Sequence, residues 1–248
     1  MKLLVDSGNT RLKWAWSEGN GLDCQPPITA GKALTRADLE KIWGRSKTRP
    51  EEVWIANVAG PAVAGLLLEW VRSHWAVPAT LVTSYTQGYG VISPYAASGK
   101  LGVDRWLALV AVRHLYPLPV CIVDCGTALT VDVMAPGGEH KGGLICPGLG
   151  LMYHSLGNGT AEVNAEERGG DSSEVLGLDT VSAVRLGIYQ AAAGLIERVV
   201  ARMAGELPGL QLILTGGDAC EIAMWLQTSP VVVPELVLQG LAEVSRRS

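Results

Sequence analysis

Two stretches of this sequence, residues 3–10 (LLVDSGNT) and 121–128 (CIVDCGTA), place an aspartate and a glycine at the end of an apolar run. They align without a gap, 118 positions apart. In such a turn the glycine lets backbone N–H groups approach phosphoryl oxygens, and Asn or Thr side chains add neutral donors. A carboxylate would repel phosphate, so its role would be to hold a cation or its water shell. Lys13 could supply positive charge beside the first turn. The pattern favours phosphate binding.

The spacing of the two stretches is close to half the chain of 248 residues. A single Asp-x-Gly after a strand is an ordinary hairpin turn in which the aspartate bonds its own backbone, and that alternative stays open. Two matching copies predict two related halves, each presenting a hairpin. A third candidate, residues 214–218 (LTGGD), runs from a strand through Gly-Gly into a helix and suits a nucleoside against backbone. Helix capping by Asp218 is the alternative there.

Two common nucleotide signatures are absent from the sequence. Gly99-Lys100 resembles the end of a P-loop, but Pro94 stands where that motif needs Gly, and Leu101 where it needs Ser or Thr. No Gly-x-Gly-x-x-Gly opens a helix after a strand, so the sequence does not support a Rossmann dinucleotide site. Two hairpins remain as the nucleotide-binding elements.

Alternating strands and helices must position these turns. Apolar patterns and turn signals predict strands at residues 2–5, 12–16, 53–56, 79–82, 120–123, 129–133, 142–145, 212–214 and 231–233. They predict helices from about 35 to 43, 61 to 75, 103 to 115, 180 to 204 and 219 to 226, a loop over 83–100, and a closing helix. Because strands and helices interleave, the fold class is α/β.

The composition narrows the classes of protein. Twenty basic and 24 acidic residues give a net charge of −4 without any charged block, which disfavours nucleic acid as a partner. The longest apolar runs, such as 62–68, are too short to cross a bilayer, and residues 1–5 are too few for a secretory h-region, so we expect a cytoplasmic protein with no membrane partner. Five scattered cysteines suit free thiols, and the Cys121–Cys125 pair lacks the partners of a zinc site.

Taken in order along the chain, these motifs resemble the type III pantothenate kinases of the acetate and sugar kinase, heat-shock 70 and actin superfamily. Residues 6–13 (DSGNTRLK) and 124–128 (DCGTA) look like the family's two phosphate motifs, and residues 214–219 (LTGGDA) look like its adenosine motif. Tyr95 with residues 102–106 (GVDRW) matches its pantothenate segment. Residues 142–148 (GGLICPG) and 234–241 (PELVLQGL) are also similar to family stretches.

The resemblance implies two actin-like halves, of the ribonuclease H-like kind, with the active site in the cleft between them. We expect the halves to span residues 1–118 and 119–248. The resemblance also implies that ATP is the co-substrate and that Asp6 lies near Mg²⁺. Asp124 corresponds to the family's ligand for a monovalent cation, K⁺ or NH₄⁺. The implied ATP contacts are Asp6, Ser7, Gly8, Asn9, Thr10, Arg11, Leu12, Lys13 and Thr127.

The same resemblance assigns the acceptor site. It implies that Asp104 is the general base and Arg105 a cation for the substrate carboxylate, with the remaining substrate contacts at Tyr95, Gly102, Val103 and Thr180. Thr180 would act from the neighbouring subunit of a homodimer. From the residues alone, Asp104 is also a first-turn helix acid, Arg105 a surface helix cation, and Thr180 a hydroxyl at a helix N-terminus.

The implied activity is ATP-dependent phosphorylation of pantothenate to 4′-phosphopantothenate, the first step of coenzyme A biosynthesis. The alternatives are a superfamily kinase for another small hydroxy acid and a non-catalytic regulatory relative. Because Asp6, Lys13 and Asp104 are intact, the sequence favours the enzyme. Two positions depart from the family pattern: Asp179 stands where Asn is common, and residues 160–164 (TAEVN) match only loosely.

Overall fold

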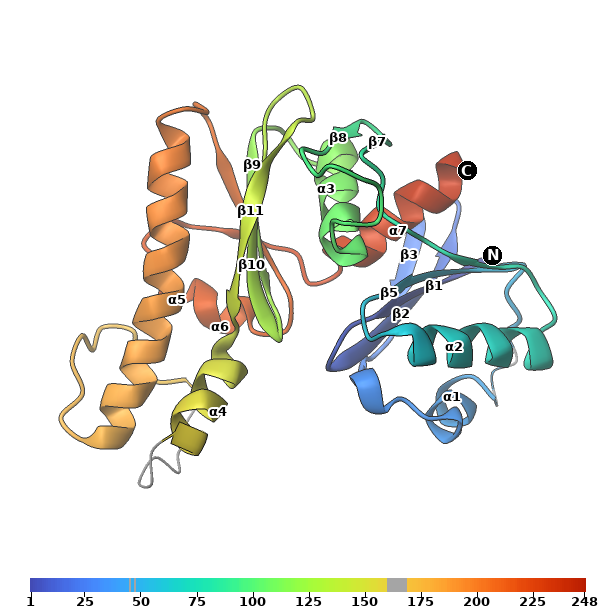
Figure 1. The fold of residues 1–248 in the computed structure, drawn as a ribbon, viewed down its shortest axis with the longest axis horizontal. Coiled ribbons are helices and arrows are strands. Elements are labelled where there is room, and N and C mark those ends of the chain that lie inside the picture. The colour runs from blue at the N-terminus through green and yellow to red at the C-terminus, as the bar shows by residue number, and fades with distance from the viewer. Residues whose placement is uncertain (45, 47, 160–168) are drawn as a thin grey trace. The chain divides into compact units, whose positions relative to one another are not determined.

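A computed structural model describes residues 1–44, 46, 48–159 and 169–248 (Figure 1). The chain divides into two compact units. The first unit joins Met1–Tyr116 to Glu235–Ser248, and the second unit is Pro117–Pro234. In the described part of the chain, no helix combines the length and apolar character that a bilayer crossing requires.

The first unit is built on a mixed sheet with the order β3-β2-β1-β5-β6, with β4 paired to β2. The pairs β1·β2 and β2·β3 are antiparallel, whereas β1·β5 and β5·β6 are parallel. The central strand β1 has almost no exposed residue, as expected for a strand covered on both faces. The strands are β1 (Lys2–Ser7), β2 (Arg11–Glu18), β3 (Gly21–Cys24), β4 (Ile28–Thr29), β5 (Glu52–Asn57) and β6 (Ala79–Leu81).

The helices of the first unit begin where the sequence signals predict. Thr35 and Asp38 form a capping box at the start of α1, and Pro61 occupies the first turn of α2. The helices are η1 (Gly31–Ala33), α1 (Arg36–Ile42), α2 (Pro61–His74), α3 (Val103–Leu115) and α7 (Leu236–Arg247). A small hairpin of β7 (Gln87–Gly88) and β8 (Val91–Ile92) precedes α3.

Tryptophan fills much of the core between the sheet and helices α1 and α2. The ring of Trp43 lies 6.1, 5.5 and 5.7 Å from the rings of Trp14, Trp70 and Trp75, measured between centroids. Aromatic rings bury large apolar areas and stabilise each other in edge and tilted arrangements. In a chain without phenylalanine, indole rings supply this part of the core.

The second unit repeats the sheet of the first. Its order is β11-β10-β9-β12-β13, with two antiparallel pairs followed by two parallel pairs. The expectation of two related α/β halves is therefore confirmed at the level of strand order and direction. The strands are β9 (Val120–Cys125), β10 (Ala128–Met134), β11 (His140–Pro147), β12 (Gln211–Thr215) and β13 (Val231–Val232), and the helices are α4 (Leu149–Gly159), α5 (Thr180–Ala204) and α6 (Ala219–Ala223).

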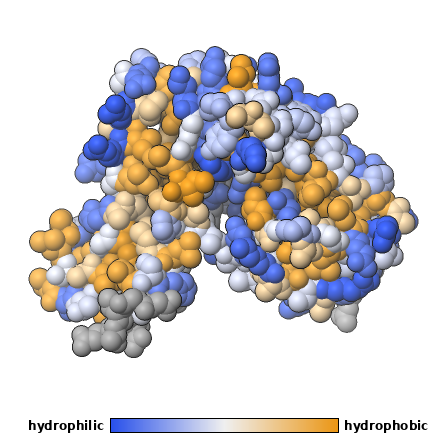
Figure 2. All heavy atoms as spheres, in the orientation of Figure 1, coloured by the Kyte–Doolittle hydropathy of each residue, from blue (hydrophilic) through white to orange (hydrophobic). Residues whose placement is uncertain are grey.

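Helices α4, α5 and α6 contribute to the apolar core on one face of the second sheet. Other large apolar side chains of this unit are exposed, and Figure 2 shows hydrophobic residues on the surface there. They include Leu144 and Ile145 of β11, Leu151 of α4, and Leu176 and Leu178 before α5. Leu178 is 99% exposed. The second unit thus presents apolar side chains that its own fold does not cover.

The structure differs from the sequence expectation in the closing segment. A boundary at 118/119 assigns residues 235–248 to the second half, but these residues pack in the first unit. Helix α7 crosses α3 so closely that a Cβ added at Gly240 would lie 2.0 Å from the carbonyl oxygen of Leu107. Helix α4 and strands β3, β4, β7 and β8 were also not predicted, and α6 ends at Ala223 instead of 226.

Candidate active site

The first hairpin places a carboxylate and an ammonium group on neighbouring strands. Asp6 of β1 lies directly opposite Lys13 of β2, so both side chains are on the same face of the sheet. Asp6 is 9% exposed and Lys13 is half-buried. The N–H of Gly8 donates to the carbonyl of Arg11 at 3.0 Å. Gly8 therefore closes the turn, and the donors expected for phosphate must come from other groups.

A second segment fixes the conformation of this turn. The N–H groups of Ala30 and Lys32 donate to the carbonyls of Thr10 and Asn9, at 3.1 and 3.2 Å. Between them, Gly31 has φ of +48°, and a Cβ there would lie only 2.0 Å from the Asn9 carbonyl oxygen. Only glycine fits this approach. The sequence carries no signal for this role of Gly31, because Gly31 belongs to no motif and lies about twenty residues after the turn that it supports.

The hydroxyl of Ser7 is a further feature of the first hairpin. Ser7 is 1% exposed, and its Oγ makes no hydrogen bond to any residue in the described ranges. A buried polar atom of this kind needs a partner such as water or a ligand oxygen. Together with Asp6 and Lys13, it gives the turn the donors and charges that suit a phosphate with its cation.

The second hairpin repeats the arrangement with different side chains. Half-buried Asp124 of β9 lies opposite Thr130 of β10, and the N–H of Gly126 donates to the Ala128 carbonyl at 3.2 Å. Here the support comes from Gly148, whose N–H donates to the Thr127 carbonyl at 3.0 Å. A Cβ at Gly148 would lie 2.1 Å from the Gly126 carbonyl oxygen. The glycine-rich segment at 142–148 therefore shapes this turn.

The structure brings the predicted adenosine motif to the same turn. Gly216 has φ of +93°, and a Cβ there would lie 2.4 Å from Asp124 Oδ1 and 2.5 Å from the Cys125 carbonyl oxygen. The N–H of Asp218 donates to that carbonyl at 2.9 Å. Asp218 occupies the N-cap position of α6 but makes no capping hydrogen bond through its side chain. Close backbone approach therefore accounts for the glycine at position 216.

The predicted substrate residues gather at the start of α3 and the segment before it. Arg105 is 7% exposed, and its Nη1 donates to the hydroxyl of Tyr95 at 3.2 Å. Its guanidinium carbon lies 6.0 Å from the centre of that ring. A surface helix cation would be exposed, so this alternative for Arg105 is wrong. A buried guanidinium with two flat faces and forked donors suits a carboxylate.

Asp104 lies beside Arg105 in the first turn of α3. Its Oδ1 accepts a hydrogen bond from the N–H of Arg105 at 2.8 Å. A Cβ at Gly102 would lie 2.6 Å from the same oxygen, so Gly102 leaves room for the carboxylate. Val103, the first residue of α3, is 9% exposed. The Asp104 carboxylate is thus held at the positive end of α3, as expected for an acid in the first turn of a helix.

Thr180 belongs to the second unit, whereas Arg105 belongs to the first. It is exposed at the first position of α5, and the N-cap of that helix is Asp179. Asp179 accepts from the Ser182 N–H at 2.9 Å, and these hydrogen bonds lower the pKa of its carboxyl. The helix therefore does not need Thr180 as its cap. The predicted departure at residues 160–164 lies outside the described residues.

The chain has five cysteines, two of which lie in β9. Each of the five lies in the described part of the chain and is a free thiol, as expected. Burial, with the Asp132 carboxylate adding to it, raises the pKa of Cys121 to about 12, and burial also raises the pKa of Cys125. Both thiols are therefore protonated at neutral pH and act as apolar packing in β9.

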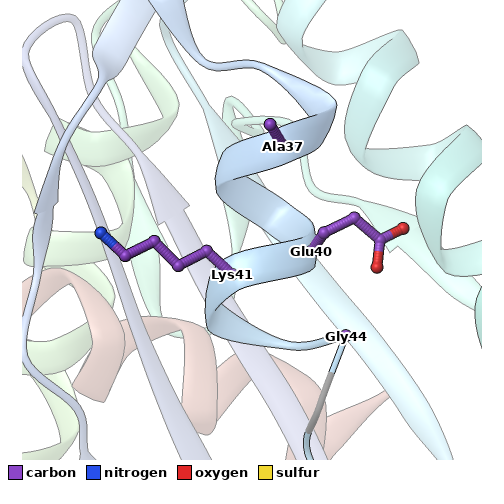
Figure 3. Close-up of a pocket in the computed structure, with 4 residues that line it drawn as sticks. All are labelled: Ala37, Glu40, Lys41 and Gly44. Carbon is purple, nitrogen blue, oxygen red and sulfur yellow. The ribbon is translucent and has the colours of Figure 1, made fainter.

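A pocket of about 410 Å³ lies on α1 and includes none of the predicted site residues (Figure 3). Its lining is Ala37, Glu40, Lys41 and Gly44. Glu40 is also engaged with His74 of α2, whose Nε2 is 2.5 Å from its Oε1. We attribute this pocket to the packing of α1, since it carries no group that the motifs require.

Solved structures share the fold with this chain. An activator of 2-hydroxyisocaproyl-CoA dehydratase from Clostridium difficile, solved with bound ADPNP, aligns with a TM-score of 0.56 at 14% identity and covers 98% of this chain and 93% of its own. Component A of (R)-2-hydroxyglutaryl-CoA dehydratase from Acidaminococcus fermentans aligns with a TM-score of 0.53 at 12% identity, covering 100% and 96%. At such identities the likeness is one of fold, the two-half actin-like architecture.

Sequence relatives are much closer. The model of the type III pantothenate kinase family matches residues 2–202. A type III pantothenate kinase from Nitrosococcus oceani is 40% identical over 252 residues, covering 99% of this chain and 94% of its own length. Another, from Nitrosospira multiformis, is 38% identical and covers 99% and 91%. With the motifs in place on the expected fold, the chain belongs to the type III pantothenate kinase family.

Proposed function

We propose that the chain transfers the γ-phosphoryl group of ATP to the primary hydroxyl of pantothenate, giving 4′-phosphopantothenate and ADP at the start of coenzyme A synthesis. The observation that carries this proposal is the buried Arg105 beside Tyr95, with Asp104 in the same helical turn. One turn then offers a cation for the substrate carboxylate and a base for its hydroxyl. The names of the relatives support the choice of pantothenate.

In this proposal the turn from Asp6 to Lys13 binds the ATP phosphates, and Thr127 of the second hairpin adds a contact. Lys13 would neutralise phosphate charge, and Asp6 would hold Mg²⁺, an ion usually bound through one or two protein carboxylates. Asp124 would hold a monovalent cation. When bound, the cations neutralise charge on the transferring group. The buried Ser7 hydroxyl and the Asp6–Lys13 pair fit these ligands.

In this proposal, residues of α3 bind pantothenate, the phosphoryl acceptor. Arg105 binds the carboxylate of pantothenate through parallel N–H donors and thereby orients its hydroxyl. Asp104 accepts the hydroxyl proton as the oxygen bonds to the γ-phosphorus and the bond from that phosphorus to the ADP oxygen breaks. The N–H of Arg105 keeps the Asp104 carboxylate in place at 2.8 Å.

We also propose that the protein works as a cytoplasmic homodimer in which Thr180 of the second unit contacts the substrate of a neighbouring copy. Support comes from the apolar side chains that precede α5, with Leu176 81% and Leu178 99% exposed. Thr180 is itself exposed and is not needed for capping. A stable interface buries apolar surface of this kind.

A coupled assay of ADP release tests the catalytic proposal. Purified protein with ATP, Mg²⁺ and K⁺ should release ADP when pantothenate is added, and not with other small hydroxy acids. Asp104→Asn should lower kcat by about 10²- to 10⁴-fold because the proton acceptor is lost. Glu69→Gln on α2, an exposed acid, is the matched control and should retain the wild-type rate. Full activity of Asp104→Asn would refute the mechanism, and preference for another acid would refute the substrate.

A further inference from the structure

The hairpin before α3 has a tyrosine where local backbone preference opposes it. In the pairing of β7 with β8, Gly88 faces Val91, so Tyr89 and Gly90 form a two-residue turn. Their φ angles are +53° and +74°. A turn with both central residues in the left-handed region is normally made with Asn, Asp or Gly. A tyrosine there costs about 1 kcal/mol or more, which the surrounding structure must offset.

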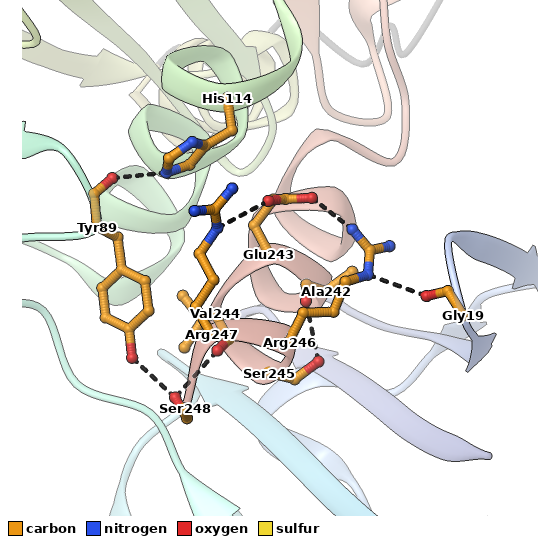
Figure 4. A network of polar contacts seen from close by, with 10 residues as sticks. All are labelled: Gly19, Tyr89, His114, Ala242, Glu243, Val244, Ser245, Arg246, Arg247 and Ser248. Atoms are coloured by element: carbon orange, nitrogen blue, oxygen red, sulfur yellow. Dashed lines mark hydrogen bonds and ion pairs between the residues drawn. The ribbon is translucent and has the colours of Figure 1, made fainter.

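Contacts from α3 hold the backbone of this turn. His114 Nε2 donates to the Tyr89 carbonyl at 2.9 Å, and Arg113 Nε donates to the Gly90 carbonyl at 3.1 Å. Because a carbonyl can only accept, His114 carries its proton on Nε2. Two side chains from the last turn of α3 thus hydrogen-bond to the tip of the hairpin, and Figure 4 shows the contact made by His114.

The side chain of Tyr89 makes two further contacts. Its ring lies edge-on to the buried ring of Trp106, 5.5 Å away at 82°, and Tyr85 flanks the same indole at 5.4 Å. Its hydroxyl is 2.8 Å from Ser248 Oγ, which in turn donates to the Val244 carbonyl at 3.0 Å. Since the Ser248 proton is used there, the Tyr89 hydroxyl is the donor. Figure 4 shows this connection to α7.

These contacts converge on the proposed acceptor site. Trp106 directly follows Arg105, and the hairpin strand β8 leads within three residues to Tyr95, which accepts from Arg105. Tyr89 therefore touches the helix that carries Arg105 and belongs to the segment that carries Tyr95. A change at Tyr89 would alter how these two partners meet.

We infer that Tyr89 is a positioning residue that sets the placement of Tyr95 on Arg105 and so governs pantothenate binding. The inference rests on the function proposed above. Tyr89 acts on them through the hairpin and through Trp106. The contacts of the ring and hydroxyl offset the cost of a tyrosine at a left-handed position.

Steady-state kinetics of three variants test the inference. Tyr89→Asn keeps a residue that tolerates positive φ but removes the ring, and it should raise KM for pantothenate about tenfold, with KM for ATP unchanged. Tyr89→Phe loses only the bond to Ser248 and should give a smaller rise in the same constant. Tyr116→Phe is the matched control. It removes another tyrosine hydroxyl bonded to α7, at 3.0 Å from Gln239, without touching the hairpin, and should leave both constants unchanged.

The outcomes separate the positioning role from a purely structural one and from the function itself. Melting temperatures of all variants are measured beside the kinetics. If Tyr89→Asn leaves the pantothenate KM within twofold of wild type, or raises both constants alike, the inference is wrong. If that variant does not fold, an unchanged pantothenate KM in Tyr89→Phe overturns it. Failure of the proposed function would appear instead as wild-type protein without pantothenate-dependent ADP release.

Discussion

The two hairpins proposed to bind phosphate and its cations share a backbone frame but differ in the side chains around them. Each follows the central strand of a sheet with the same order, and each has an aspartate at its root. Directly opposite Asp6 stands Lys13, whereas opposite Asp124 stands Thr130. A carboxylate with an ammonium neighbour suits a site for phosphate with Mg²⁺, and one with a hydroxyl neighbour suits a weakly held cation. The backbone arrangement repeats, and single side chains on the second strand distinguish the two roles proposed for the hairpins.

The largest changes in activity are expected when the two aspartates are replaced one at a time. Asp6→Asn is expected to lower kcat by about 10³-fold, since the carboxylate assigned to Mg²⁺ is lost. Asp124→Asn should instead remove activation by K⁺, so that its rates in KCl and in choline chloride are equal. Both are measured by ADP release at varied Mg²⁺ and K⁺. Equal responses of the two variants to both ions would mean that the hairpins are not specialised.

Exchanging the residues opposite the aspartates probes the same difference from the other strand. Lys13→Met should reduce kcat/KM for ATP by about 10²-fold because phosphate charge loses a partner. Thr130→Val, which removes the corresponding hydroxyl in the second hairpin, should change it by less than about threefold. The pantothenate KM, measured at saturating ATP, serves as internal control for both variants. A comparable loss in Thr130→Val would contradict the assignment of phosphate charge to the first hairpin alone.

Replacing the glycines that support the two turns should give the next largest effects. Gly31→Ala and Gly148→Ala each force a methyl group against a turn carbonyl, at 2.0 and 2.1 Å in the present backbone. Each should cost about 2–3 kcal/mol of unfolding free energy and raise KM for ATP about tenfold. Urea denaturation and kinetics measure the two effects. Gly31→Ala should cost more, since its φ of +48° is also unfavourable for alanine.

Gly187→Ala provides the control for these glycine variants. Gly187 lies inside α5, and a Cβ there meets no atom within 4 Å. Because alanine has a higher helix propensity, this change should raise stability by about 1 kcal/mol. A loss of similar size in all three variants would show that the turn contacts are not the cause.

The smallest expected difference is in the free energy of unfolding at alkaline pH, and it concerns the strands β1 and β9 that lead into the two hairpins. Strand β9 holds buried Cys121, whose pKa rises from 9.0 to about 12, whereas β1 has no thiol. A thiol whose folded pKa is raised stabilises fully below pH 9, and this contribution is lost as pH rises toward 12. Over the range from pH 9 to 10.5, wild type should lose about 1.6 kcal/mol more unfolding free energy than Cys121→Ala in urea denaturation. Cys220→Ala, at an exposed thiol, should follow wild type.

The parts of the structure that local patterns determine were predictable. Helix α3 runs from 103 to 115 as expected, and α5 from 180 to 204, because the apolar periodicity of each helix lies within its own segment. Helix α4 was missed since its sequence is rich in glycine, which has a low helix propensity. The hairpin with Tyr89 was missed because its turn lacks the expected Asn or Asp before glycine.

The candidate site shows the same division. The repeat singles out Asp6 and Asp124 as candidate site residues, and the family resemblance singles out Asp104. The burial of Arg105 against Tyr95 and the support of Asn9 by Gly31 depend on contacts between segments distant from each other in sequence. Such contacts leave no periodic signal, so they had to come from the folded structure.

The return of residues 235–248 to the first unit has a consequence for the order of folding. The second unit is one continuous segment, but the first unit needs two segments with all of 117–234 between them. Domains fold as units once their chain has emerged from the ribosome. The second unit can therefore be complete while the first still lacks the helix that packs on α3. A nascent chain stopped before residue 235 would therefore carry the α3 surface uncovered.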